Sequence, residues 1–72
     1  MVKERVDEAY ARYEKLGHLE IEDMFIWLDS ERIIGAYNMF EAPKYLLEKF
    51  SLELRDIKEA RLVTNAWMET FK

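Results

Sequence analysis

The chain has 72 residues, half of them hydrophobic, with ten aromatic side chains, no cysteine and a formal net charge of −4. This length fits one domain around one core, and so much apolar material excludes an intrinsically disordered chain. The lack of cysteine excludes a disulfide framework, a thiolate nucleophile and a cysteine-based zinc site.

The first ten residues, MVKERVDEAY, are strongly charged, and no apolar run approaches the length of a membrane span. We therefore expect a cytoplasmic protein without a signal peptide or a membrane helix.

Charge is unevenly distributed along the chain. Residues 1–42 carry five bases against ten acids, whereas residues 44–61 carry five bases against four acids. The segment between His18 and Glu31 contains acids and no base. These acids are Glu20, Glu22, Asp23, Asp29 and Glu31.

Residues 2–16 predict an amphipathic helix that ends at Gly17, because glycine enters the left-handed conformation of a helix C-terminus without steric strain. Their apolar side chains recur at steps of three and four, with charged residues between them. These apolar residues are Val2, Val6, Ala9, Tyr10, Tyr13 and Leu16.

His18 is the only histidine, and it lies near several acids. No second histidine or comparable ligand lies at a helical spacing from it, so we expect a solvated linker residue rather than a metal ligand or catalytic base.

Residues 19–28 again have helical spacing, and they include the apolar run Met24–Leu28. Five consecutive large apolar residues leave no polar face, so this run is expected at the centre of the fold. Ile26 and Trp27 lie off the main apolar stripe and need cover from another element or another chain.

The apolar stripe shifts in phase after Leu28, by about 140° if the helix continued. Asp29 and Ser30 are good N-cap residues at this shift, so we expect a break there and a new helix over residues 30–41. Gly35 inside that helix would permit a close approach between helices.

Ala42-Pro43 marks the next boundary, because proline suits the first turn of a helix. A short helix is expected over residues 43–50, and Ser51 is expected to cap the last helix. Three apolar residues, Leu54, Leu62 and Ala66, lie off the apolar stripe of that last helix. The stripe consists of Ile57, Ala60, Val63, Thr64, Trp67 and Phe71.

Together these patterns predict an all-α fold: a compact bundle of four or five short helices in a single domain spanning residues 1–72. No repeat, low-complexity tract or linker interrupts it.

A helix-turn-helix-like pair lies near residues 43–62 and suggests a DNA-binding transcriptional regulator. In that interpretation Arg55, Lys58 and Arg61 contact bases or phosphates. Leu47 stands where a small residue is usual, Ser51 where glycine is common, and acids of the same helix repel phosphate. An ordinary helical hairpin with ion pairs on a solvated face explains the same segment.

Large apolar residues left after each helix has faced the core favour a different function, protein–protein contact, in which the partner is a second copy of the chain or another protein. A 72-residue domain has limited interior, and a dimer would bury the remainder. A core of four or five helices that simply covers these residues is the competing interpretation. They are Ile26, Trp27, Tyr37, Leu62 and Met68.

The acidic residues between Glu20 and Glu31 raise a third possibility, an inhibitor that grips a basic partner, although such residues often form a solvated face. No nucleophile is paired with a base and no glycine-rich phosphate loop is present, so the sequence indicates no enzyme, cofactor or small-molecule substrate.

Overall fold

The computed structural model describes residues 2–35 and 39–71, with Met39 through its backbone alone. Within these ranges the chain forms four α-helices, two 3-10 helices and no strand, which confirms the predicted all-α fold. The α-helices are α1 (Val2–Arg12), α2 (Glu22–Ile34), α3 (Ala42–Lys49) and α4 (Ile57–Thr70), and the 3-10 helices are η1 (Glu14–His18) and η2 (Met39–Glu41).

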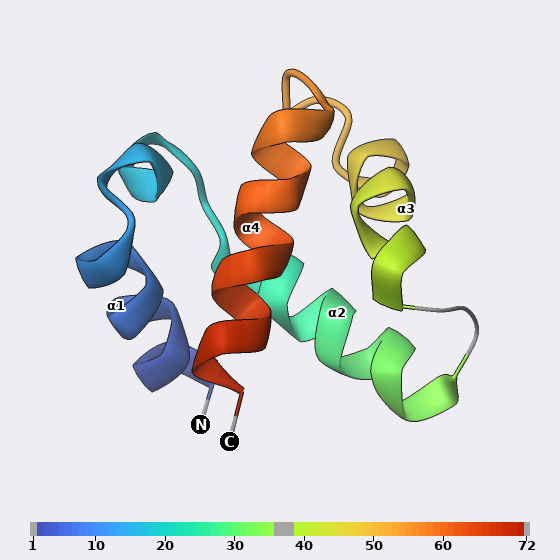
Figure 1. The fold of residues 1–72 in the computed structure, drawn as a ribbon, viewed down its shortest axis with the longest axis horizontal. Coiled ribbons are helices and arrows are strands. Elements are labelled where there is room, and N and C mark those ends of the chain that lie inside the picture. Colours follow the sequence, from blue (N-terminus) through green and yellow to red (C-terminus); the bar gives the residue numbers. More distant parts are fainter. Residues whose placement is uncertain (1, 36–38, 72) are drawn as a thin grey trace.

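Two helices, α2 and α4, each pack against the other three. Figure 1 shows α4 running across the front of α2, with α1 on one side of α4 and α3 on the other. The buried side chains of these helices form one hydrophobic cluster between them. The helix α4 is therefore covered on its inner side and faces solvent on its front.

Three of the five residues in the apolar run Met24–Leu28 lie at the centre of the fold, as predicted. Met24, Phe25 and Leu28 are fully buried. Trp27 is half-buried and packs against the core, where its ring meets Phe50 edge to face with 6.3 Å between ring centroids. Ile26 stays exposed.

The first helix is shorter than its apolar pattern predicts. It ends at Arg12, and Tyr13 takes an extended backbone conformation before η1 begins. This bend carries Leu16 into the core, where it is fully buried. Gly17 has no left-handed backbone, so the predicted glycine cap is wrong, and the helix ends instead before the extended Tyr13.

The predicted break at Asp29 and Ser30 is also wrong, because α2 continues through both residues. The Ser30 hydroxyl donates to the carbonyl of Ile26, as serine does inside a helix. The phase shift has another cause: the later residues Ile33 and Ile34 are 83% and 71% exposed, so they do not belong to a buried stripe.

Gly35 ends α2 with φ 70° and ψ 31°, the left-handed C-cap conformation. A Cβ atom there would meet nothing within 4 Å, so the glycine serves backbone conformation and not close helix approach. The helix expected over residues 30–41 is therefore wrong at its start, and its residues 36–38 lie outside the described residues.

The helix after Pro43 is confirmed, with proline in its first turn and Leu46 fully buried. The last helix begins at Ile57 and not after Ser51: the Asp56 carboxylate accepts from the backbone N–H of Glu59 at 3.0 Å and forms the N-cap.

The loop between α3 and α4 contains a turn in which the carbonyl of Phe50 accepts from the backbone N–H groups of Glu53 and Leu54. This turn buries Leu54, which is 3% exposed, and leaves Leu52 96% exposed. Leu54 is thus a core residue that anchors the loop, which explains why the helix cannot begin at Ser51.

Candidate interaction surface

The solvent-facing side of α4 carries six side chains, which we call the α4 outer face. Because an α-helix has about 3.6 residues per turn, positions three and four apart share one side. This side lies opposite the buried Ala60, Val63 and Trp67. The α4 outer face consists of Lys58, Arg61, Leu62, Asn65, Met68 and Glu69.

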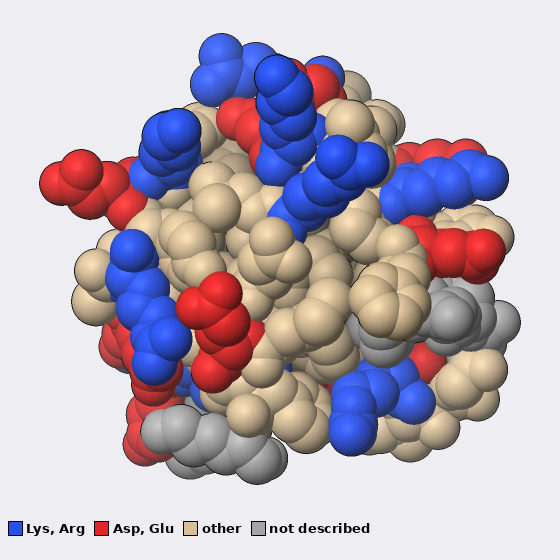
Figure 2. All heavy atoms as spheres, viewed as in Figure 1, with Lys and Arg blue, Asp and Glu red and all other residues tan. Residues whose placement is uncertain are grey.

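The middle of the α4 outer face is uncharged. Figure 2 shows uncharged residues over the centre of this side of the molecule, with several Lys and Arg side chains at the end where α4 starts and others around the rim. Leu62 is half-buried against the core, and Met68 is 41% exposed. An uncharged centre with a charged rim is the usual arrangement of a protein–protein interface.

The charges on the α4 outer face are separated along the helix, with Lys58 and Arg61 in its first half and Glu69 in its last turn. In the part of the chain that the structure describes, no ion pair uses Lys58 or Arg61. Both cations are exposed, so they are available to a partner.

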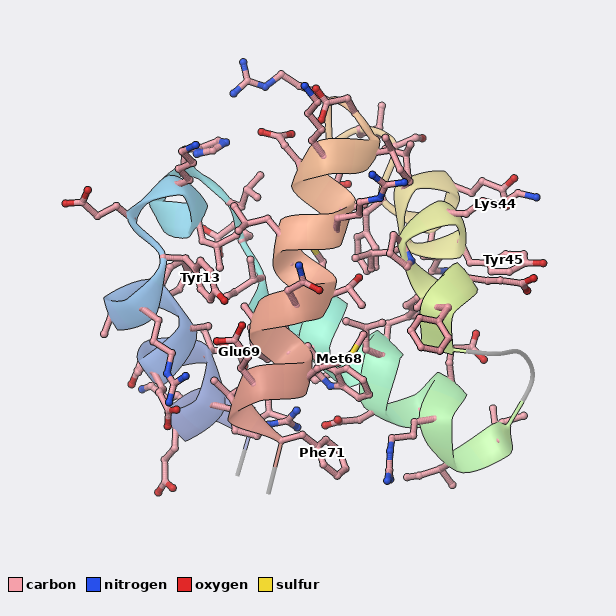
Figure 3. The ribbon with its side chains drawn as sticks, viewed as in Figure 1. Tyr13, Lys44, Tyr45, Met68, Glu69 and Phe71 are labelled. Carbon is pink, nitrogen blue, oxygen red and sulfur yellow. The ribbon has the colours of Figure 1, made fainter. Side chains whose placement is uncertain are left out.

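Glu69 is held in place by α1 and the residue after it. The Tyr13 hydroxyl donates to its carboxylate, and Arg12 Nη1 lies 3.3 Å from Glu69 Oε1. The hydrogen bond with the Glu69 carboxylate raises the pKa of Tyr13. Figure 3 shows Tyr13 beside Glu69 on one side of α4 and Met68 on the other. The side chain of Glu69 remains 47% exposed, so it can accept further donors.

Beyond the last turn of α4, the Phe71 ring packs against two guanidinium groups. Arg5 Cζ lies 4.8 Å and Arg32 Cζ 4.2 Å from its centroid, and the Trp67 ring meets it edge to face at 5.3 Å. Phe71 is partly exposed because it lies at the edge of the core, in contact with α1 and α2 through these arginines.

The other end of α4 is fixed by a hydrogen-bonded cluster around Glu59. Its carboxylate accepts from the backbone N–H of Arg55 at 2.7 Å and lies 3.0 Å from His18 Nε2 and 3.5 Å from Arg55 Nη2. The hydrogen bond from the Arg55 backbone, followed by that with His18, lowers the pKa of Glu59. His18 therefore joins η1 to the start of α4.

Four of the five residues predicted as an interface lie among the described residues, on two helices. Leu62 and Met68 lie on the α4 outer face, whereas Ile26 and Trp27 belong to α2, where Trp27 packs toward Phe50. The fifth predicted residue, Tyr37, lies outside the described residues.

Sequence reasoning did not include Asn65 and Glu69 in the predicted interface. Their signal was the spacing of exposed residues on α4, at steps of three and four opposite the buried stripe. A prediction based on surplus apolar residues does not include the polar residues of the same face.

The residues predicted to contact DNA are all exposed, but only Lys58 and Arg61 lie on α4. Arg55 lies in the loop before the helix and pairs with Glu59. The helices α3 and α4 do pack together, yet the loop of residues 50–56 between them is longer than the turn of roughly three to four residues in a helix-turn-helix.

One of the five acidic residues between Glu20 and Glu31 is paired within the fold. Asp29 binds Arg5 and the indole N–H of Trp67, so its charge is used inside the protein. Glu20 before α2, and Glu22 and Asp23 in the first turn of α2, are exposed. Among the described residues, no group of three or more potential ligands is arranged to hold a metal ion.

No protein-family model, curated protein or solved structure matches this chain. Across residues 2–35 and 39–71, every helix is too short or too polar to cross a membrane.

Proposed function

We propose that this chain is a non-catalytic helical module that acts through protein–protein contacts and self-associates. The observation that carries the proposal is that seven large apolar side chains remain exposed among the described residues. They are Ile26, Ile33, Ile34, Phe40, Leu52, Met68 and Phe71.

This exposure is large for so small a protein, whose accessible surface is 4963 Å². Single exposed apolar residues are common, but several together favour a surface that a partner covers. Leu62 and Trp27 add to it, because both remain only half-buried after the helices have packed. Covering part of this area would also stabilise a domain whose single core is small.

Light scattering over concentrations up to the millimolar range, with and without duplex DNA, tests the proposal. We expect a mass above the 8.7 kDa of one chain in the absence of DNA, and no change when DNA is added. A mass of one chain at every concentration would contradict self-association.

A helix-turn-helix DNA-binding regulator is a second candidate, supported by the exposed cations gathered at the start of α4 in Figure 2. Exposed lysines and arginines bind phosphates with a strong dependence on salt. The long loop before α4 and the pairing of Arg55 with Glu59 weaken this candidate.

A mobility shift on mixed-sequence duplex DNA separates the two candidates. A DNA-binding protein would shift the duplex at low salt, lose the shift as salt rises, and lose it with Lys58→Glu or Arg61→Glu. We expect no shift at any salt concentration.

A further inference from the structure

We infer that the partner on the α4 outer face is a second copy of this chain, with the two α4 helices antiparallel and a two-fold axis beside Asn65. The inference rests on the proposed self-association and specifies its surface. A two-fold dimer needs a surface that is complementary to itself, and the order of residues on the α4 outer face meets this requirement.

Antiparallel pairing about Asn65 matches residues that lie equally far before and after it. Arg61, four residues before, then faces Glu69 of the partner subunit, four residues after. Leu62, three residues before, faces Met68 of the partner subunit, three residues after. Each match occurs twice, so two ion pairs flank an uncharged centre that contains Leu62, Asn65 and Met68.

The charges on the α4 outer face also favour antiparallel over parallel pairing of the two α4 helices. In a parallel pair each residue would face its own copy, so Arg61 would meet arginine and Glu69 would meet glutamate, and both contacts repel. In the antiparallel pair, each guanidinium meets a carboxylate. Tyr13 and Arg12 already hold that carboxylate on the outer surface, so little side-chain freedom is lost on pairing.

Asn65 would set the register of the pair. It is exposed at the middle of the face, and its amide both donates and accepts, so two copies can hydrogen-bond across the axis. A polar residue at the centre of a helix pair specifies register in the same way in coiled coils. If one α4 helix shifted by one turn along the other, both the contact between the two asparagines and the ion pairs would be lost.

The small size of the α4 outer face limits the expected affinity of the dimer. From Arg61 to Glu69 the helix advances about 12 Å, which is short beside a standard interface that buries about 800 Å² on each partner. The dimer is therefore expected to be weak, with dissociation in the micromolar range or above, and to weaken further as salt screens its ion pairs.

The test uses two charge reversals, Arg61→Glu and Glu69→Arg, measured alone and mixed by sedimentation at low salt. Each variant alone would place like charges together twice, so we expect its dissociation constant to rise about tenfold or more. Mixed in equal amounts, the two variants would have both pairs complementary again, and we expect them to form a heterodimer.

Two reversals elsewhere provide matched controls. Lys3→Glu on α1 and Glu48→Arg on α3 change the net charge by the same amounts at exposed positions outside the α4 outer face. We expect both to associate as the unchanged chain does. Circular dichroism shows whether each variant keeps its helices.

Replacing Glu69 also removes its contact with Tyr13, so a second measurement leaves Glu69 unchanged. The chain has no cysteine, so Asn65→Cys introduces a single thiol beside the proposed axis. Under oxidation we expect rapid disulfide-linked dimers from Asn65→Cys and few from Glu48→Cys, since a disulfide needs Cα atoms within about 7 Å.

The outcomes separate this inference from the proposed function. If the unchanged chain dimerises while the reversals have no effect and Asn65→Cys fails to cross-link, another surface mediates association and the inference is wrong. If the unchanged chain is a monomer throughout, self-association itself fails, and the inference fails with it.

Discussion

Arg5 and Asp29 form a two-pronged ion pair that joins α1 to α2: Arg5 Nη1 lies 2.9 Å from Asp29 Oδ1 and 3.1 Å from Oδ2. The same guanidinium donates to the carbonyls of Trp67 and Thr70 in the last turn of α4, and the Trp67 carbonyl also accepts from the Thr70 hydroxyl. Trp67 completes the network by donating its indole N–H to Asp29 at 2.8 Å. One arginine thus links three helices.

Removing this arginine is expected to destabilise the fold more than any other charge deletion in α1. Arg5→Ala should lower the free energy of unfolding by about 2–4 kcal/mol, because it removes the cation paired with a partly buried carboxylate and the donor that two carbonyls share. Urea denaturation measures the change. Lys3→Ala, at an exposed position of the same helix, should stay within about 0.5 kcal/mol of the unchanged chain. Equal effects of the two substitutions would refute the structural role of Arg5.

A double-mutant cycle tests the pairing itself. Arg5→Ala and Asp29→Ala should together cost less stability than the sum of the two single changes, with a coupling of about 1–3 kcal/mol, because they share one interaction. Independent, additive losses would mean that Asp29 acts locally in α2, as the N-cap expected from sequence would.

The two leucines of the loop before α4 should differ sharply. Leu54→Ala should cost about 2–4 kcal/mol of stability, because it empties a buried site in the core. Leu52→Ala should change stability little, since that side chain is almost fully exposed. Thermal unfolding compares the two variants directly, and a larger loss of stability with Leu52→Ala would contradict the role of Leu54 as the core residue of this loop.

The two glycines should also respond differently to alanine. Gly35→Ala should cost about 1–2 kcal/mol, because a Cβ atom is strained in the left-handed conformation. Gly17 has no such conformation and no neighbouring atom within 4 Å of a new Cβ, so Gly17→Ala should be neutral or slightly stabilising. Chemical denaturation of both variants provides the comparison.

Acid should weaken the link between η1 and α4. The pKa of Glu59 is lower in the folded chain than its ordinary value, so the unfolded chain binds more protons as pH falls. Its stabilising contribution is therefore present above the ordinary glutamate pKa and is lost as pH falls through the lowered folded value. In Glu59→Gln, the free energy of unfolding should fall less steeply with decreasing pH over this acid range. An identical slope in the two proteins would contradict a stabilising contribution of the Glu59 carboxylate.

Local sequence pattern was sufficient where one helix buries one stripe. The spacing of Ala60, Val63 and Trp67 predicted the inner side of α4, and Pro43 marked the start of α3. These features depend on residues close together in the chain, so no knowledge of the tertiary arrangement was needed.

The pattern failed where a distant contact decides the role of a residue. Asp29 resembles an N-cap, but its partners Arg5 and Trp67 lie 24 and 38 residues away. Tyr13 fits a helical stripe, but the core position of Leu16 requires a bend there. The sequence pattern likewise did not predict the α4 outer face, because the surface that it is proposed to contact lies on another molecule.

Sedimentation equilibrium of the unchanged chain, from micromolar to millimolar concentration at low salt, determines whether the chain self-associates. We expect the average mass to rise with concentration from 8.7 kDa toward twice that value and to fall back when salt is added. A mass that stays at 8.7 kDa over the whole range would contradict self-association.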